Sequence, residues 1–286
     1  MIQEFDLHIH TINSDGEFTT KQLVQKIRES NIKTFAIADH DSIKSIKDMK
    51  EIDLTGLNYI KAIEISSILD NKYKMHILGY NINEEDEQLL EIINNIKQKR
   101  IKRIYDIANS LKQQHNIVLK DEELENLIKE NNIPGKVHIA ELLLKNNYVE
   151  TVPEAFTKYL EDIKIMKIAR EDALKVIKTI KNAGGIAIWA HPKKTEQQHN
   201  INMEKILPRL ISHGLEGIEV YNSLHTYEES QRYIEIAKKY NILTSGGSDY
   251  HGPIAKPNVI LGKIYKDNKN YEVSKEQITL LAKLKE

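Results

Sequence analysis

The hydrophobic and polar positions alternate between strand and helix patterns at both ends of the chain. Residues 5–10 and 34–38 are typical of strands, and between them Thr19 followed by Gln22 is typical of a capping box that opens a helix. After these, the pattern predicts a helix over residues 170–183 and three more strands, at 186–190, 216–221 and 243–245. Strand and helix units separated by short loops predict an α/β fold with a mainly parallel sheet, closed as a barrel or left open.

Two further strand-like segments lie close together in the first part of the chain. Residues 59–66 and 73–80 flank Asp70 and Asn71, and their connection is too short for a helical crossover. They therefore predict a β-hairpin, which interrupts the parallel order of the sheet.

The middle of the chain has a helical pattern without strand signals. One long charged helix opens this segment, and shorter helices are expected to begin near Asp121, Val137 and Pro153. The apolar positions of the long helix are Leu89, Ile93, Ile96, Ile104, Ile107 and Leu111. We expect residues 84–169 to form a helical insertion that caps the main domain, whose two parts are then residues 1–83 and 170–286.

Composition and charge limit the classes of function. The 286 residues include 41 Lys and Arg against 42 Asp and Glu, a net charge of -1, so no overall positive field favours a stable nucleic-acid complex or an anionic membrane. The chain shows neither a signal peptide nor the roughly 18 consecutive apolar residues of a membrane span. It contains no cysteine, which excludes disulfides and thiolate zinc sites and leaves imidazole and carboxylate as metal ligands. We expect a cytoplasmic protein of undetermined oligomeric state.

Candidate metal ligands lie at the ends of the predicted strands or in the loops that follow them. His8 and His10 alternate along the first strand and therefore face the same side. An isolated histidine beside an apolar strand is usually a hydrogen-bonded core residue, but six of the eleven histidines occupy such positions, which favours a shared metal site. The nine candidates are His8, His10, Asp15, His40, Glu64, His76, His191, Asp249 and His251.

Nine candidates exceed what a single catalytic ion requires, since such a site takes about three protein ligands. Two or three divalent ions with a bridging carboxylate fit better, and ligation without sulfur suits Mn²⁺, Fe²⁺ or Zn²⁺. Closely spaced ions of this kind activate water and neutralise phosphate charge, so the set predicts hydrolysis of a phosphate ester.

The ordered motifs of the chain resemble the PHP family, whose name stands for polymerase and histidinol phosphatase. They are Asp6-Leu7-His8-Ile9-His10, Ser14-Asp15-Gly16, Ala38-Asp39-His40-Asp41-Ser42, Glu64, Ala190-His191-Pro192 and Ser248-Asp249-Tyr250-His251-Gly252. The resemblance spans the chain from the first strand to the last. It implies a distorted barrel of about seven strands, a (β/α)7 arrangement with a helical insertion, and a trinuclear metal site at the nine positions.

Within the family, the sequence is similar to a branch that includes nucleoside 3',5'-bisphosphate phosphatases. The similarity implies a small phosphorylated metabolite as substrate, with loss of the 3'-phosphate. For this reaction we expect Asp249 to orient or deprotonate the attacking water as well as to bind metal. The similarity also implies phosphate contacts from Arg100 and Arg103, which share a helix face, although such a face is also typical of a solvated stripe. That branch commonly has Arg-Pro-His where this chain has Lys136-Val137-His138, so Lys136 and His138 are further candidates.

The alternatives differ in substrate or in class. Histidinol phosphate carries an amine and calls for an acidic group in place of Arg100 and Arg103. Stepwise 5'-3' trimming of short RNA is a second enzymatic alternative. A non-catalytic module of a polymerase or repair complex is a third, but degenerate modules lose ligands, and here the full set is present.

Overall fold

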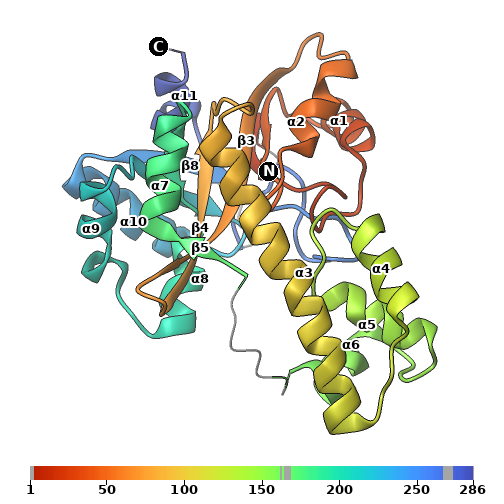
Figure 1. The fold of residues 1–286 in the computed structure, drawn as a ribbon. Coiled ribbons are helices and arrows are strands. Elements are labelled where there is room, and N and C mark those ends of the chain that lie inside the picture. Colours follow the sequence, from red (N-terminus) through yellow and green to blue (C-terminus); the bar gives the residue numbers. More distant parts are fainter. Residues whose placement is uncertain (1–2, 162, 164–168, 267–272, 286) are drawn as a thin grey trace. The chain divides into compact units, whose positions relative to one another are not determined.

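Seven strands follow one another across a curved sheet, with helices around them (Figure 1). In the computed structural model, which describes residues 3–161, 163, 169–266 and 273–285, the order is β1-β2-β3-β4-β6-β7-β8. A parallel bridge between Ile9 and Tyr250 links β1 to the segment after β8, so the sheet nearly closes as a barrel and the predicted architecture is confirmed. The strands are β1 (Phe5–Ile9), β2 (Thr34–Ile37), β3 (Asn58–Leu69), β4 (Tyr73–Tyr80), β5 (Glu171–Asp172), β6 (Ile186–Trp189), β7 (Gly217–Asn222) and β8 (Leu243–Gly247).

The strand β4 runs opposite to the rest of the barrel. It pairs antiparallel with β3 and with β6, whereas the other neighbouring strands of the series are parallel. The predicted hairpin is confirmed, and Asp70 and Asn71 form its turn with φ values of 55° and 52°. The sequence pattern ended the first arm at residue 66, but β3 continues to Leu69 because its pairing with β4 extends that far, and Ser67 and Ile68 also pair with the two-residue strand β5.

The helices of the barrel begin where side chains cap their first turns. The predicted capping box of Thr19 and Gln22 opens α1, which buries Leu23, Val24 and Ile27 against β1 and β2. The helix predicted over residues 170–183 is shorter than expected, because Asp172 caps the backbone N–H of Lys175 and the helix begins after it. These helices are α1 (Thr20–Glu29), α2 (Lys44–Asp48), α7 (Ala173–Asn182), α8 (Pro192–His199), α9 (Leu207–Ser212), α10 (Tyr227–Tyr240) and α11 (Thr279–Lys283).

The seam between β1 and β8 is tightly packed. A Cβ added at Gly247 would lie 2.4 Å from the Cβ of His8, so β8 approaches β1 this closely because Gly247 has no side chain. The hydroxyl of Tyr80 in β4 donates a hydrogen bond of 2.8 Å to the carbonyl of Leu7 inside the barrel. These contacts fix the position of β1 in the barrel and therefore the position of the side chains at its end.

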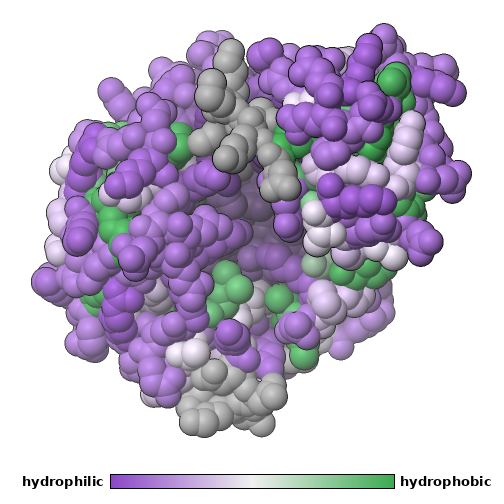
Figure 2. Space-filling model, turned by 90° about the horizontal axis from the view of Figure 1, so that it is seen from below, coloured by the Kyte–Doolittle hydropathy of each residue, from purple (hydrophilic) through white to green (hydrophobic). Residues whose placement is uncertain are grey.

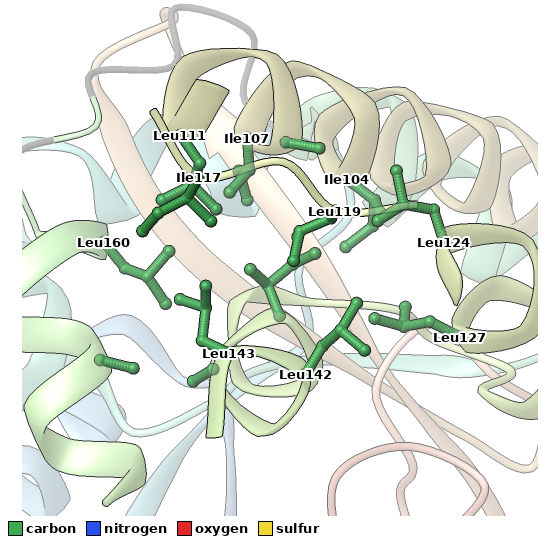
Figure 3. Close-up of a cluster of buried hydrophobic side chains, with 14 of the residues drawn as sticks. Ile104, Ile107, Leu111, Ile117, Leu119, Leu124, Leu127, Leu142, Leu143 and Leu160 are labelled. Carbon is green, nitrogen blue, oxygen red and sulfur yellow. The ribbon is translucent and has the colours of Figure 1, made fainter. Parts of the chain in front are cut away.

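A second compact unit covers Ile93–Arg170, and the barrel unit covers Met1–Ile92 with Glu171–Glu286. The helix α3 (Glu87–His115) begins in the barrel unit, and α4 (Asp121–Glu130), α5 (Lys136–Lys145) and α6 (Val152–Ala155) follow it. Figure 3 shows the hydrophobic core of the second unit, in which side chains of α3, α4 and α5 converge. Its labelled members are Ile104, Ile107, Leu111, Ile117, Leu119, Leu124, Leu127, Leu142, Leu143 and Leu160.

The predicted limits of the insertion, residues 84 and 169, stay a prediction, as does its position over the site. Residues 1–2, 162, 164–168, 267–272 and 286, which fall within the three predicted segments, lie outside the described residues. On the face seen in Figure 2, the described surface is mostly hydrophilic and its hydrophobic residues form separate small patches. None of the helices in the described ranges is long and apolar enough to cross a bilayer.

Candidate metal centre

The structure brings all nine predicted ligands together at one end of the barrel unit. His8 lies in β1, His10 directly follows it, and His40 follows β2. The prediction that Glu64 closes its strand is wrong, because β3 continues for five residues as an arm of the hairpin; the parallel pairing at Glu64 is a bridge to His40. His76 lies near the start of β4, and because β4 is reversed, this start lies beside the carboxyl ends of the parallel strands.

Glu64 lies at the centre of the cluster and is fully buried. Its Oε2 is 3.2 Å from Nε2 of His8, 3.4 Å from Nε2 of His10 and 2.9 Å from Nδ1 of His40. The second oxygen, Oε1, lies 2.9 Å from both Nδ1 of His76 and Nε2 of His191. One carboxylate therefore faces five imidazoles from four segments of the chain, the arrangement expected of a bridging ligand.

Two aspartates extend the cluster on either side of His10 and His251. Asp249 places Oδ1 3.2 Å from Nε2 of His10 and 3.5 Å from Nδ1 of His251. Asp15 places Oδ1 3.2 Å from Nε2 of His251 and 3.7 Å from Nδ1 of His10. The side chain of Asp15 is 45% exposed whereas that of Asp249 is 3% exposed, so Asp15 marks the open side of the cluster.

The cluster has the donor set and the unpaired atoms that divalent metal ions require. Three overlapping groups have ligand atoms within 4.8 Å of one another: His10, Asp15, His40 and His251; His8, His10, Glu64 and Asp249; and His40, Glu64 and His76. Among the described residues, Nε2 of His8, Nε2 of His10, Nδ1 of His40 and Oε2 of Glu64 are buried without a hydrogen-bond partner. Buried polar atoms are rarely left unpaired, so their convergence fits metal ions as the missing partners.

Burial and neighbouring groups in the cluster shift the pKa values of Glu64 and His10. Burial would raise the pKa of Glu64, but the imidazoles of His40 and His8 outweigh burial and hold that pKa well below its usual value. Burial and the neighbouring imidazole of His251 lower the pKa of His10 well below its usual value. At neutral pH Glu64 is therefore an anion and His10 a neutral ring, the protonation states in which both groups bind metal.

Buried carboxylates outside the cluster hold the ligand-bearing loops. Asp39 accepts hydrogen bonds of 2.7 Å from the backbone N–H and hydroxyl of Thr11 and from the hydroxyl of Ser14, which fixes the loop that carries Asp15. Asp6 accepts hydrogen bonds from the backbone N–H and hydroxyl of Ser248, at 2.8 and 2.6 Å, and so anchors the loop of Asp249. Asp6 and Asp39 occur in the sequence motifs, which gave them no role.

Two further residues at the cluster were not predicted. Glu219 in β7 contacts His8 and the backbone of His191. Its signal in the sequence is a charge within a buried strand, because the other residues of β7 before Asn222 are glycine, aliphatic or aromatic. Lys256 places Nζ 2.6 Å from Oδ2 of Asp249 and lies in a loop without regular pattern, so no sequence signal pointed to it.

The four predicted substrate-binding residues lie in the helical unit. Arg100 and Arg103 are half-buried on α3, and Nε of Arg103 is buried without a hydrogen-bond partner among the described residues. Burial, followed by the charge of Arg100, lowers the pKa of Arg103. Lys136 donates a hydrogen bond to the carbonyl of Leu160, and Nδ1 of His138 accepts one of 3.0 Å from the backbone N–H of Gly135. Their role in substrate binding stays a prediction.

Several characterised proteins are similar to this chain over most of its length. A phosphoribosyl 1,2-cyclic phosphate 1,2-diphosphodiesterase of Eggerthella lenta is 26% identical, covering 88% of this chain and 95% of its own length. A 5'-3' exoribonuclease of Escherichia coli is 29% identical, with coverage of 91% and 88%. A 3',5'-nucleoside bisphosphate phosphatase of Chromobacterium violaceum is 24% identical and covers 87% of each chain.

A solved structure is similar to this chain in fold. A candidate metal-dependent phosphoesterase of Bifidobacterium adolescentis superimposes with a TM-score of 0.75 at 28% identity and covers 93% of both chains. The PHP domain family matches residues 6–206, which include seven of the nine clustered side chains, His8, His10, Asp15, His40, Glu64, His76 and His191. The chain therefore belongs to the PHP domain family and is a metal-dependent phosphoesterase, a hydrolase that acts on phosphate ester bonds.

Proposed function

We propose that this phosphoesterase removes the 3'-phosphate of a nucleoside 3',5'-bisphosphate, using two or three divalent ions held by the nine clustered residues. The relatives support a ribose-linked phosphate, because their names describe a phosphoribosyl compound, RNA and a nucleoside bisphosphate. The observation that carries the choice of a bisphosphate is the guanidinium of Arg103, which is half-buried beside Arg100 and has an unpaired Nε. A buried guanidinium favours an anionic partner, and a second phosphate supplies one.

The clustered side chains have different roles in the proposed reaction. Divalent ions bound there supply Lewis acidity, which polarises phosphoryl oxygens and activates water for attack on phosphorus. Oδ1 of Asp249 orients the attacking water or takes its proton, while Nζ of Lys256 holds Oδ2 of the same carboxylate at 2.6 Å. The exposure of the Asp15 side chain supports entry of the phosphate from that side of the cluster.

Kinetics on matched substrates test this proposal. Protein loaded with Mn²⁺ is assayed with a nucleoside 3',5'-bisphosphate, the 3'- and 5'-monophosphates, histidinol phosphate and a short 5'-phosphorylated RNA. We expect kcat/KM for the bisphosphate to exceed that for either monophosphate by roughly ten- to a hundredfold, the contribution of about one charge-assisted contact. Equal values for the bisphosphate and the monophosphates would contradict the proposal.

The Escherichia coli relative supports 5'-3' exoribonuclease activity as the second candidate. The two functions differ in their products, because an exonuclease releases mononucleotides stepwise from the 5' end, whereas a phosphatase releases phosphate and leaves the chain length unchanged. Separation of the RNA products by length, together with a phosphate assay, distinguishes them. Turnover of RNA with kcat/KM above that of the bisphosphate would make the exonuclease the main function.

The variant Arg103→Ala tests the assignment of the second phosphate. It should lower kcat/KM for the bisphosphate about ten- to a hundredfold and leave turnover of a generic aryl phosphate unchanged. Lys102→Ala is a matched control on the same helix, since the exposed Lys102 pairs with Asp106 at 3.5 Å. A solvated helix face predicts small and equal effects of both substitutions, so a variant that keeps its full bisphosphate preference removes Arg103 from the substrate site.

A further inference from the structure

The strand β7 contains one fully buried carboxylate, that of Glu219. A buried charge is costly unless donors surround it, and both oxygens of Glu219 have donors. Oε1 lies 2.9 Å from Nδ1 of His8, and Oε2 accepts hydrogen bonds from the backbone N–H of His191 at 2.7 Å and from Nδ2 of Asn222 at 3.0 Å. Glu219 therefore joins two clustered histidines, one in β1 and one that follows β6.

The contact with His8 determines which ring nitrogen carries the proton. A carboxylate oxygen is a hydrogen-bond acceptor, so in the 2.9 Å contact Nδ1 of His8 is the donor and carries a proton. The other nitrogen, Nε2, is then the ring atom that faces the cluster. It points toward Oε2 of Glu64 at 3.2 Å and Oδ1 of Asp249 at 3.7 Å, and it has no hydrogen-bond partner among the described residues.

The contact with His191 holds an unusual backbone conformation. His191 has φ 29° and ψ 63°, a left-handed conformation that residues other than glycine rarely adopt. Such a conformation persists where surrounding contacts determine it, and the bond from its N–H to Glu219 is one of those contacts. With the backbone in this conformation, Nε2 of His191 lies 2.9 Å from Oε1 of Glu64.

We propose that Glu219 is a positioning residue that prepares two ligands for the metal ions, His8 through its ring tautomer and His191 through its backbone. A carboxylate behind a ligating imidazole fixes the orientation of the ring and makes the ligating nitrogen more basic. This inference rests on the proposed metal ligation by His8 and His191, and it does not depend on the identity of the substrate.

The variant Glu219→Gln separates this role from a packing role, because glutamine fills the same space. If the amide oxygen faces Nδ1 of His8, the amide NH₂ faces the N–H of His191, and two donors oppose each other. If the amide is turned, its NH₂ donates to Nδ1 of His8 and favours the tautomer with a proton on Nε2, which blocks the ligand atom. Either orientation breaks one of the two contacts.

Metal binding and the His8 tautomer are the readouts. Chelator-treated wild type, Glu219→Gln and the control Glu216→Gln are titrated with Zn²⁺ by calorimetry, and folding is checked by circular dichroism. Glu216 directly precedes β7 and pairs with Lys181 at 3.3 Å. We expect Glu219→Gln to bind Zn²⁺ about ten- to a hundredfold more weakly than wild type and Glu216→Gln to bind normally. Long-range ¹H–¹⁵N spectra of Zn²⁺-loaded wild type should show a proton on Nδ1 of His8.

A second variant covers the case in which the glutamine does not fold. Glu219→Asp keeps the negative charge but withdraws the carboxylate by about 1.5 Å, so it cannot reach both His8 and His191. Weaker Zn²⁺ binding by this variant supports positioning, whereas wild-type affinity in either folded variant overturns it. A wild-type protein that binds no Zn²⁺ or Mn²⁺ would refute the ligand assignment itself, an outcome distinct from failure of the Glu219 proposal.

Discussion

Replacement of Glu64 by glutamine should abolish the stabilisation of the protein by metal. The carboxylate serves two of the three groups of potential ligands and faces five imidazoles, and an amide keeps its size but removes its charge. Loss of a residue that only supports a ligand weakens metal binding about ten- to a hundredfold, so loss of a shared ligand should cost at least about a hundredfold.

The expected effect on thermal stability follows from mass action. At a metal concentration of about 100 times Kd, binding stabilises the folded state by about 2.7 kcal/mol. A barrel unit of this size gains roughly 2 to 4 °C in Tm per kcal/mol, so metal should raise the Tm of wild type by about 5 to 10 °C. With affinity a hundredfold weaker, the same concentration contributes about 0.4 kcal/mol and raises Tm by about 1 °C.

Differential scanning fluorimetry with and without Mn²⁺, combined with elemental analysis, measures both quantities. Glu84→Gln is the matched control, since Glu84 is buried and pairs with Lys61 at 2.6 Å. The control should have a lower Tm than wild type and an unchanged response to metal. A Glu64→Gln protein with a full metal-induced shift and full occupancy would exclude a bridging role for Glu64.

Two other predictions concern Asp249 and His225. Asp249→Asn should lower kcat by about a hundredfold or more, measured at confirmed metal occupancy; wild-type kcat would remove Asp249 from the reaction. Burial lowers the pKa of His225 to about 4 in the folded protein. The unfolded chain therefore binds a proton at this residue near pH 6.5, whereas the folded protein binds it only near pH 4. Stability from this group is complete above pH 6.5 and falls by about 3 kcal/mol as the pH drops to 4. Urea unfolding in chelator should show this loss in wild type and a smaller one in His225→Gln; equal losses would contradict the assignment.

The convergence of the nine side chains could be predicted from the sequence because each one has a local signal. His8 and His10 alternate at the end of a short strand, and Asp249 and His251 follow a strand, with His251 directly before Gly252. The rules that place side chains at the carboxyl ends of strands then suffice to bring them together. The reversed strand β4 was also predictable, because the turn at Asp70 and Asn71 is short.

The contacts that hold the clustered side chains could not be predicted in the same way. Glu219 acts through His8, which is 211 residues away, and Lys256 acts through Asp249 from an irregular loop. Such contacts depend on the register between β7 and the strands beside it and on the closeness of β1 to β8, neither of which a hydrophobic pattern specifies. The end of β3 was missed for a related reason, because the pattern does not specify how far its pairing with β4 extends or that Ser67 and Ile68 also pair with the distant strand β5.

Because the helical unit interrupts the barrel in the sequence, the parts of the barrel become available for folding in a fixed order as the chain is synthesised. When residue 170 has been made, six of the nine clustered residues, from His8 to His76, are already present, but His191, Asp249 and His251 are still to come. The strand β4 can pair with β3 at this stage but not with its second partner β6, which begins at Ile186, and the pairing of Tyr80 with Ile186 closes a loop of about 105 residues. The helical unit has a core of its own and is continuous in sequence, so it can fold during this interval. A nascent chain therefore cannot assemble the complete cluster until the segment after β8 has left the ribosome.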